Sequence, residues 1–67
     1  MVDMNGKELK IGDKVRPDGP GMVLLIVSEF DVEELGHCLF GQQIENPLVF
    51  SPLTKEDLAT GWILIEE

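Results

Sequence analysis

Reactive side chains are scarce in this sequence of 67 residues, which has one cysteine, one histidine and no tyrosine. The single Cys38 cannot form a disulfide within the chain, which argues against a disulfide-rich secreted scaffold and favours a reducing compartment. The longest apolar run, residues 22–27, is far shorter than the roughly 20 residues that a membrane helix needs. The start of the chain lacks the basic and apolar regions of a signal peptide. We therefore expect a soluble, cytoplasmic protein with no membrane partner.

Basic residues are also few, since 5 Lys and Arg stand against 13 Asp and Glu, for a net charge of -8. This charge repels the phosphates of nucleic acids and anionic lipid surfaces, so we expect direct binding to neither. A basic protein partner complements such a surface, and simple solubility is the alternative explanation. Of the basic residues only Lys55 lies beyond the first quarter of the chain, which contains Lys7, Lys10, Lys14 and Arg16.

The length and composition predict a single small domain over residues 1–67. A hydrophobic content of 43% argues against disorder. A chain of this size buries only about 60% of its surface on folding, so such domains often rely on a partner subunit. Asn5-Gly6 is typical of a type I′ turn, which would make residues 1–11 an N-terminal hairpin extension.

Short β-rich segments separated by turn residues dominate the rest of the chain. We expect strands at residues 14–17, 22–30, 37–44, 48–51 and 62–65, with Pro52 closing the fourth. Residues 31–36 read as a loop or one helical turn. Residues 54–59 predict a short helix with Thr54 as its N-cap and Gly61 at its end. The predicted fold class is mainly β, a small barrel or β-roll of five to six short strands with one short helical turn.

Two of these strands, residues 22–27 and 62–65, are apolar on both faces. A small closed barrel needs only one apolar face per strand. The second face must be covered by the N-terminal hairpin, by the helix that carries Leu58, or by another subunit. For the last alternative, we hypothesise that the chain forms a homodimer.

The first half of the chain resembles the opening of SH3-like small barrels and of KOW-type nucleic-acid modules. There an aliphatic-Gly-Asp-x-Val strand start precedes a Gly-Pro loop, here at residues 11–15 and 19–20. The chain is more closely similar to the YodC-like small bacterial proteins, with Phe40 where that family has tryptophan. This resemblance implies a fold more firmly than a function, because SH3-like barrels serve many functions. Its matching residues are Gly12, Asp13, Val15, Gly19, Pro20, Met22, Cys38, Phe40, Phe50 and Pro52.

Catalytic and metal-binding patterns do not emerge from the sequence. His37 and Cys38 are adjacent, and adjacent strand residues point to opposite faces, so His37 is badly placed to deprotonate Cys38. We expect a buried Cys38 and a surface His37. The spacings of zinc sites, calcium loops and phosphate-binding loops do not occur. We therefore expect a protein that is not an enzyme and has no metal or cofactor.

The aromatic residues are expected in the core. Phe30, Phe40 and Phe50 are ten residues apart, which we attribute to the length of short strands, and core packing is favoured over a peptide groove. Trp62 is the exception, because its N–H needs a partner and suits an interface. The candidate partner-binding residues are Glu29, Asp31, Glu33, Glu34 and Trp62.

Three functions remain open at this point. The preferred hypothesis is a small non-enzymatic protein–protein interaction or accessory module that binds through uncovered apolar strand faces, with acidic residues selecting a basic partner. The alternative is an acidic inhibitor that mimics nucleic acid and blocks a basic nucleic-acid-binding protein. The third is KOW-like nucleic-acid binding through the basic N-terminal residues.

Overall fold

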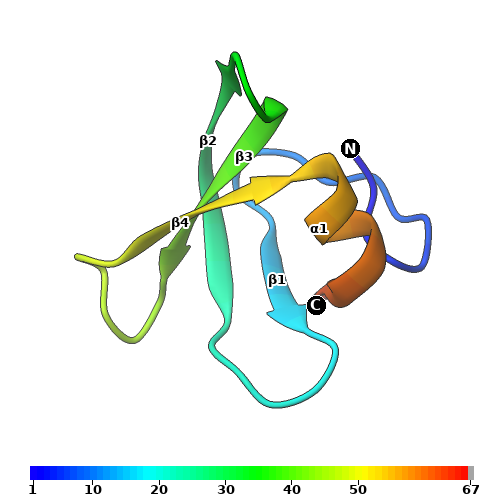
Figure 1. Cartoon of the computed structure of the whole chain (residues 1–67). Coiled ribbons are helices and arrows are strands. Elements are labelled where there is room, and N and C mark those ends of the chain that lie inside the picture. Colours follow the sequence, from blue (N-terminus) through cyan, green and yellow to red (C-terminus); the bar gives the residue numbers. More distant parts are fainter. Residues whose placement is uncertain (67) are drawn as a thin grey trace.

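The computed structural model describes residues 1–66 of the chain. Within that range five antiparallel strands form one sheet with the order β4-β3-β2-β1-β5, and one helix precedes the last strand (Figure 1). The prediction of a mainly β fold with one short helix is confirmed. The elements are β1 (Lys14–Pro17), β2 (Leu24–Val32), β3 (Gly36–Gln43), β4 (Phe50–Thr54), α1 (Lys55–Gly61) and β5 (Trp62–Leu64).

Strands β2 and β3 form a long hairpin that is tightly closed. The Leu35 N–H donates to the Val32 carbonyl at 3.1 Å, and Gly36 takes a positive φ of 77°. Residues 31–36 are therefore a hairpin turn and the ends of two strands, and the helical-turn alternative is wrong. The register shifts between Ile26 and Ser28, and such a bulge bends a strand and increases its twist.

The boundaries of strand β4 differ from the predicted ones. The sequence pattern placed a strand at residues 48–51 closed by Pro52, whereas β4 starts at Phe50 and continues through Pro52 to Thr54. Proline removes a ladder donor and is normally confined to edge strands. Since β4 lies at one edge of the sheet, it accommodates the proline.

Helix α1 begins with the predicted cap. Thr54 Oγ1 accepts from the Asp57 N–H at 3.0 Å, and the Asp57 carboxylate accepts from the Thr54 N–H at 3.3 Å. This reciprocal capping box satisfies two otherwise unpaired backbone donors. Gly61 is the last helical residue and not a left-handed cap, because the chain passes directly into an extended Trp62 with φ of -128°.

The core lies on the inner face of the curved sheet, beneath α1 and the N-terminal segment. Gly41 is buried here because β3 approaches its neighbours closely: a Cβ at this position would lie 2.9 Å from Leu24 Cδ1 and 3.3 Å from Leu53 Cδ1. Leu58 points from α1 into the centre and is fully buried. The buried core residues that cluster together are Leu9, Val15, Leu24, Ile26, Leu39, Leu53 and Leu58.

The N-terminal segment makes a different turn from the predicted one. A type I′ turn needs positive φ at both central residues, but among residues 1–66 only glycines have positive φ, here Gly6 at 81°. The Gly6 N–H donates to the Asp3 carbonyl at 3.0 Å, and the Asp3 N–H donates to the Lys7 carbonyl at 2.9 Å. The two predicted arms still pair antiparallel, at the Val2–Glu8 bridge and through the Leu9 N–H, which donates to the Met1 carbonyl at 2.8 Å.

The Asp3 carboxylate attaches this segment to the far end of the chain. Its side chain is 2% exposed. One oxygen accepts from the N–H groups of Asn5 and Lys7, at 2.9 and 2.8 Å, and the other accepts from the Leu64 N–H at 2.7 Å. The segment also contributes Leu9 to the core. It therefore covers part of the inner face, which was one of the predicted alternatives.

Candidate interaction surface

The outer face of strands β2, β3 and β4 carries a row of aromatic side chains. Residues paired across neighbouring strands share a face, and successive residues alternate between faces. Leu39 and its partner Leu53 belong to the core, so Phe40 and its partner Ser28 face outward. By the same alternation Phe30 and Phe50 also face outward. We refer to Phe30, Phe40 and Phe50 as the aromatic row.

The aromatic row crosses the sheet diagonally, one ring per strand. The centroids of Phe30 and Phe40 are 5.2 Å apart in an edge-on arrangement, and those of Phe40 and Phe50 are 5.4 Å apart and stacked. Phe30 and Phe40 are half-buried, and Phe50 is 44% exposed. None of the three belongs to the core cluster. The expectation that they pack in the core is wrong, because strand alternation assigns the inward positions to leucines.

A hollow lies beside the central ring of the row. It is shallow and open, is lined by Ser28, Phe30 and Phe40, and has a volume of about 270 Å³. Ser28 pairs directly with Phe40, and its small side chain leaves space between the two large rings. The lining of the hollow is mainly apolar.

The loop between β3 and β4 extends the apolar surface beyond Phe50. Leu48 at its tip is 88% exposed, and Ile44 and Val49 are also exposed. The loop is ordered by hydrogen bonds, since Gln42 Nε2 donates to the Pro47 carbonyl at 2.9 Å and the Val49 N–H donates to the Asn46 carbonyl at 3.0 Å. The apolar tip is therefore presented in a defined conformation.

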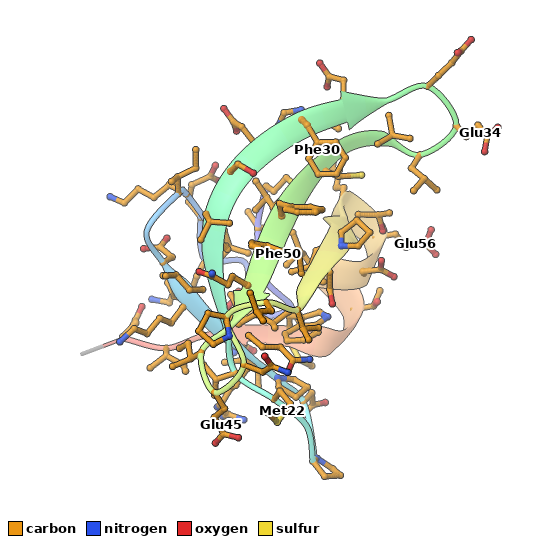
Figure 2. The ribbon with its side chains drawn as sticks, turned by 90° about the vertical axis from the view of Figure 1, so that its left-hand side faces the viewer. Met22, Phe30, Glu34, Glu45, Phe50 and Glu56 are labelled. Atoms are coloured by element: carbon orange, nitrogen blue, oxygen red, sulfur yellow. The ribbon has the colours of Figure 1, made fainter. Side chains whose placement is uncertain are left out.

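Carboxylates lie around this surface. In Figure 2, Phe30 and Phe50 lie on the side turned to the viewer, and Glu34, Glu45 and Glu56 lie around its outline. Glu34 is in the β2–β3 turn, beyond the Phe30 end of the row, and Glu45 is in the loop that precedes Phe50. Glu34 and Glu56 also line an open depression of about 530 Å³ between the β2–β3 turn and α1, which Lys55 lines as well. We refer to Glu34, Glu45 and Glu56 as the acidic rim.

Two of the predicted partner-binding acids lie on the opposite face. Asp31 and Glu29 alternate with Phe30 and contact His37, with Asp31 Oδ1 2.7 Å from His37 Nδ1 and Glu29 Oε2 3.3 Å from His37 Nε2. The hydrogen bond to Asp31, followed by that to Glu29, raises the pKa of His37 above its ordinary value of 6.5. These two carboxylates are engaged by the chain's own histidine, a contact that the sequence reasoning missed.

The remaining predicted site residues are dispersed. Glu33 lies with Glu34 in the exposed β2–β3 turn. Trp62 begins β5, pairs with Pro17 and packs half-buried against the core. The structure therefore brings Glu29 and Asp31 together around His37, and Glu33 and Glu34 at the turn, but does not join them with Trp62 into one surface.

The reactive side chains are separated as expected. Cys38 is fully buried and its Sγ donates to the Gly36 carbonyl at 3.7 Å, whereas His37 is exposed. Among residues 1–66, no group of three or more His, Cys, Asp or Glu side chains could hold a metal ion. In the same range, no helix has the length and apolar character needed to cross a membrane.

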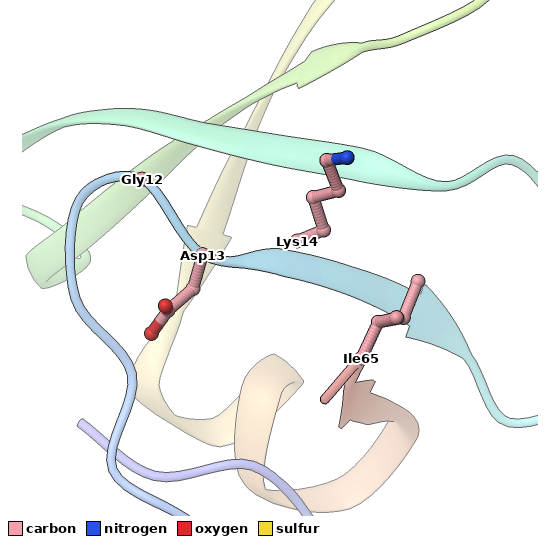
Figure 3. Close-up of a pocket in the computed structure, with 4 residues that line it drawn as sticks. All are labelled: Gly12, Asp13, Lys14 and Ile65. Atoms are coloured by element: carbon pink, nitrogen blue, oxygen red, sulfur yellow. The ribbon is translucent and has the colours of Figure 1, made fainter. Parts of the chain in front are cut away.

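The Gly12-Asp13 motif has a structural role. The Gly12 N–H donates to the Ile26 carbonyl at 2.8 Å, and the Ile26 N–H donates to the Asp13 carbonyl at 2.9 Å, which ties the turn to β2. The adjoining depression of about 210 Å³ is lined by Gly12, Asp13, Lys14 and Ile65. The Asp13 and Lys14 side chains diverge from each other (Figure 3), so they do not form a convergent polar site.

The fold and this surface define a small, mainly β protein with one uncovered aromatic face on its sheet. A scan against protein-family models finds no match to the chain, and searches of curated proteins and of solved structures find no significant one.

Proposed function

We propose that this protein is a non-enzymatic protein-interaction module that binds its partner through the aromatic row. The observation that carries the proposal is the row itself, together with the exposed apolar residues of the loop that precedes Phe50. Contiguous exposed apolar surface is costly for a soluble domain and marks interaction sites when it is rimmed by polar residues. Aromatic residues are enriched at the centres of protein interfaces.

The charge around the row supports a protein partner over a nucleic acid. Stacked rings on a sheet are a common platform for unpaired bases. Such platforms are combined with basic grooves that follow the phosphates, whereas Glu34, Glu45 and Glu56 lie toward the outline of this face (Figure 2). KOW-like nucleic-acid binding is thus the least supported of the three functions. We keep the SH3-like and YodC-like resemblance, the cytoplasmic location and the homodimer as proposals.

The acidic inhibitor is the second candidate, because exposed carboxylates occur at several turns. An inhibitor that mimics nucleic acid would bind through carboxylates and lose its partner at high salt. An apolar module would bind through the rings and keep its partner at high salt. The salt dependence of partner binding therefore distinguishes the acidic inhibitor from the apolar module.

The test is affinity capture from source-cell lysate with three forms of the protein: wild type, Phe50→Ser and Ile11→Ser. Ile11 is an exposed apolar residue outside the row, so its variant controls for a general loss of surface hydrophobicity. The proposal expects a protein that wild type and Ile11→Ser retain at high salt and that Phe50→Ser loses. A partner retained equally by all three forms would contradict it. A partner released by salt from all three forms would favour the acidic inhibitor.

A further inference from the structure

We propose that the partner segment bound by the aromatic row is a short amphipathic α-helix with Lys or Arg residues flanking its apolar stripe. This inference rests on the proposed function and adds the chemistry of the partner. It is drawn from the spacing of the rings, the hollow at Ser28 and the positions of the acidic rim.

The spacing of the row matches the repeat of a helix. Its two steps are 5.2 and 5.4 Å between ring centroids, and one turn of α-helix rises about 5.4 Å. Side chains at positions i, i+4 and i+7 of a helix rise by about 6.0 and 4.5 Å, so over two steps they span nearly the same length as the row and stay within about 1 Å of each ring. Side chains on one face of an extended strand recur about every 6.6 Å and lose register by the third ring.

The hollow supplies an anchor point for one of these side chains. Ser28, Phe30 and Phe40 line this shallow, open hollow, and a leucine or methionine from the partner would pack against both rings. Central, well-packed anchors of this kind contribute most of the binding energy of an interface. The flanking rings and the exposed Leu48 would then pack on either side of the anchor.

The acidic rim selects the charge of the partner. Glu34 lies beyond the Phe30 end of the row and Glu45 beyond the Phe50 end. Lys or Arg residues about one turn outside the apolar stripe would reach these carboxylates, and complementary charge at a rim accelerates association and excludes wrong partners. A second copy of this chain would bring its own carboxylates to the rim, and a nucleic acid would bring phosphates. A basic helix is the occupant that the charges favour.

The probes are three synthetic peptides of about 14 residues, a length that gives roughly four helical turns. The first carries leucines at i, i+4 and i+7 with lysines at both ends. The second has the same composition with the leucines at alternate positions. The third has glutamates in place of the lysines. Binding to the full chain is measured by fluorescence anisotropy of the labelled peptide, together with chemical-shift changes in the protein.

We expect wild-type protein to bind the first peptide at least about tenfold more tightly than the second or the third. Chemical-shift changes should centre on residues 28–30, 40 and 50. Glu34→Gln with Glu45→Gln should weaken binding and reduce its salt dependence, because these carboxylates contact the lysines. Glu29→Gln, the same charge change on the opposite face of β2, should leave binding unchanged.

Two variants of the surface distinguish a shaped site from a merely sticky one. Phe50→Ser removes a ring, and Ser28→Leu fills the hollow while making the surface more apolar. Both should weaken the first peptide by about tenfold, whereas non-specific apolar adhesion would be strengthened by Ser28→Leu. Thermal unfolding checks that each variant is folded, and Phe50 is the safer position because it lies on an exposed edge strand.

Several outcomes would overturn the inference. They are equal binding of the first two peptides, no binding of the first peptide up to about 1 mM, stronger binding by Ser28→Leu, or preferential binding of labelled single-stranded DNA. A dimer in sedimentation that Phe50→Ser dissociates would identify a second copy as the occupant and would also overturn it. If Phe50-dependent capture of a protein persists while the peptides fail, the proposed function stands and only the helical, basic character of the partner is lost.

Discussion

The two faces of the β2–β3–β4 sheet are built from alternating residues of the same strands, yet they have opposite surroundings. The inner face carries Ile26, Leu39 and Leu53 and is covered by Leu58 of α1 and by Leu9 of the N-terminal segment. The outer face carries the aromatic row, which lies outside the core cluster, with Phe30 and Phe40 half-buried and Phe50 exposed. Burial on one face stabilises the fold, whereas the exposed rings on the other are available to a partner. The comparison predicts that changes on the inner face affect stability and changes on the outer face affect binding.

The largest difference between the faces should appear at Leu58. Leu58→Ala should lower the free energy of unfolding by about 3 kcal/mol, because it leaves a cavity at a fully buried position. Phe50→Ala on the outer face should cost less than about 1 kcal/mol. Urea denaturation of both variants measures the comparison. Equal losses would mean that the outer face contributes to the fold as much as the inner face does.

The cover over the inner face depends on Asp3. Asp3→Asn replaces a buried carboxylate that accepts three backbone N–H bonds with an amide that directs an NH₂ group at one of them. We expect a loss of about 2 kcal/mol at neutral pH. Asp13→Asn, which changes an exposed carboxylate–backbone hydrogen bond, is the matched control and should have a smaller effect.

The effect of Asp3 should also depend on pH. Burial alone raises the pKa of Asp3, but hydrogen bonds from the N–H groups of Leu64, Lys7 and Asn5 outweigh it, so the net pKa lies below the ordinary 3.8. A carboxylate with a lowered pKa contributes stability that is present above its unfolded pKa and is lost as the pH falls through the folded value. The stability difference between wild type and Asp3→Asn should therefore shrink on acidification below about pH 4. A difference that does not change with pH would show that the charge of Asp3 is unimportant.

Enlarging a side chain should lower the free energy of unfolding more on the inner face than on the outer face, although by less than the changes above. Gly41→Ala places a Cβ 2.9 Å from Leu24 Cδ1 on the inner face and should cost about 1 to 2 kcal/mol by overpacking. Ser28→Leu enlarges a residue beside the outer hollow and should leave stability within about 0.5 kcal/mol of wild type. Thermal or urea unfolding measures both. A larger loss for Ser28→Leu than for Gly41→Ala would contradict the assignment of the faces.

The smallest effect should come from the exposed cluster at His37. Asp31→Asn should lower the pKa of His37 more than Glu29→Gln does, because the contact to Asp31 is shorter and is the main cause of the raised pKa. NMR titration of the imidazole measures both shifts. A raised histidine pKa contributes stability that is present below the unfolded value of about 6.5 and is lost as the pH rises through the folded value. Since the groups are exposed, this contribution should be weak and should decrease with salt. A larger decrease of the His37 pKa in Glu29→Gln than in Asp31→Asn would show that Glu29, and not Asp31, is the main cause of the raised pKa.

Much of the fold could be predicted from local sequence signals. Turn residues delimited four of the five strands to within a few residues, and Thr54 with Asp57 located the helix cap, because caps and turns depend on neighbouring residues. The Asn5-Gly6 turn was assigned to the wrong type, because the Asp3 side chain organises it from outside the dipeptide. Pro52 was assigned as a strand end, because its tolerance depends on β4 lying at the sheet edge, which no local signal reveals.

The candidate surface was harder to predict than the fold. The ten-residue spacing of Phe30, Phe40 and Phe50 was the available signal, and it was attributed to strand length alone. It became informative only with the strand registers, which bring the three rings onto one face. The acidic residues were a useful signal of the expected partner charge, but Glu29 and Asp31 proved to contact His37 on the other face.

The β-rich character, the positions of most turns, the helix cap and the acidic charge follow from composition or from residues a few positions apart, so they can be predicted without the fold. Which apolar residues point inward depends on the assembled sheet, because strand alternation leaves two equivalent faces until the strand register and the covering elements are in place. Leu9 and Leu58 cover one face, and the bond from Asp3 to Leu64 holds part of that cover in place. The aromatic row is the apolar surface that remains exposed as a result.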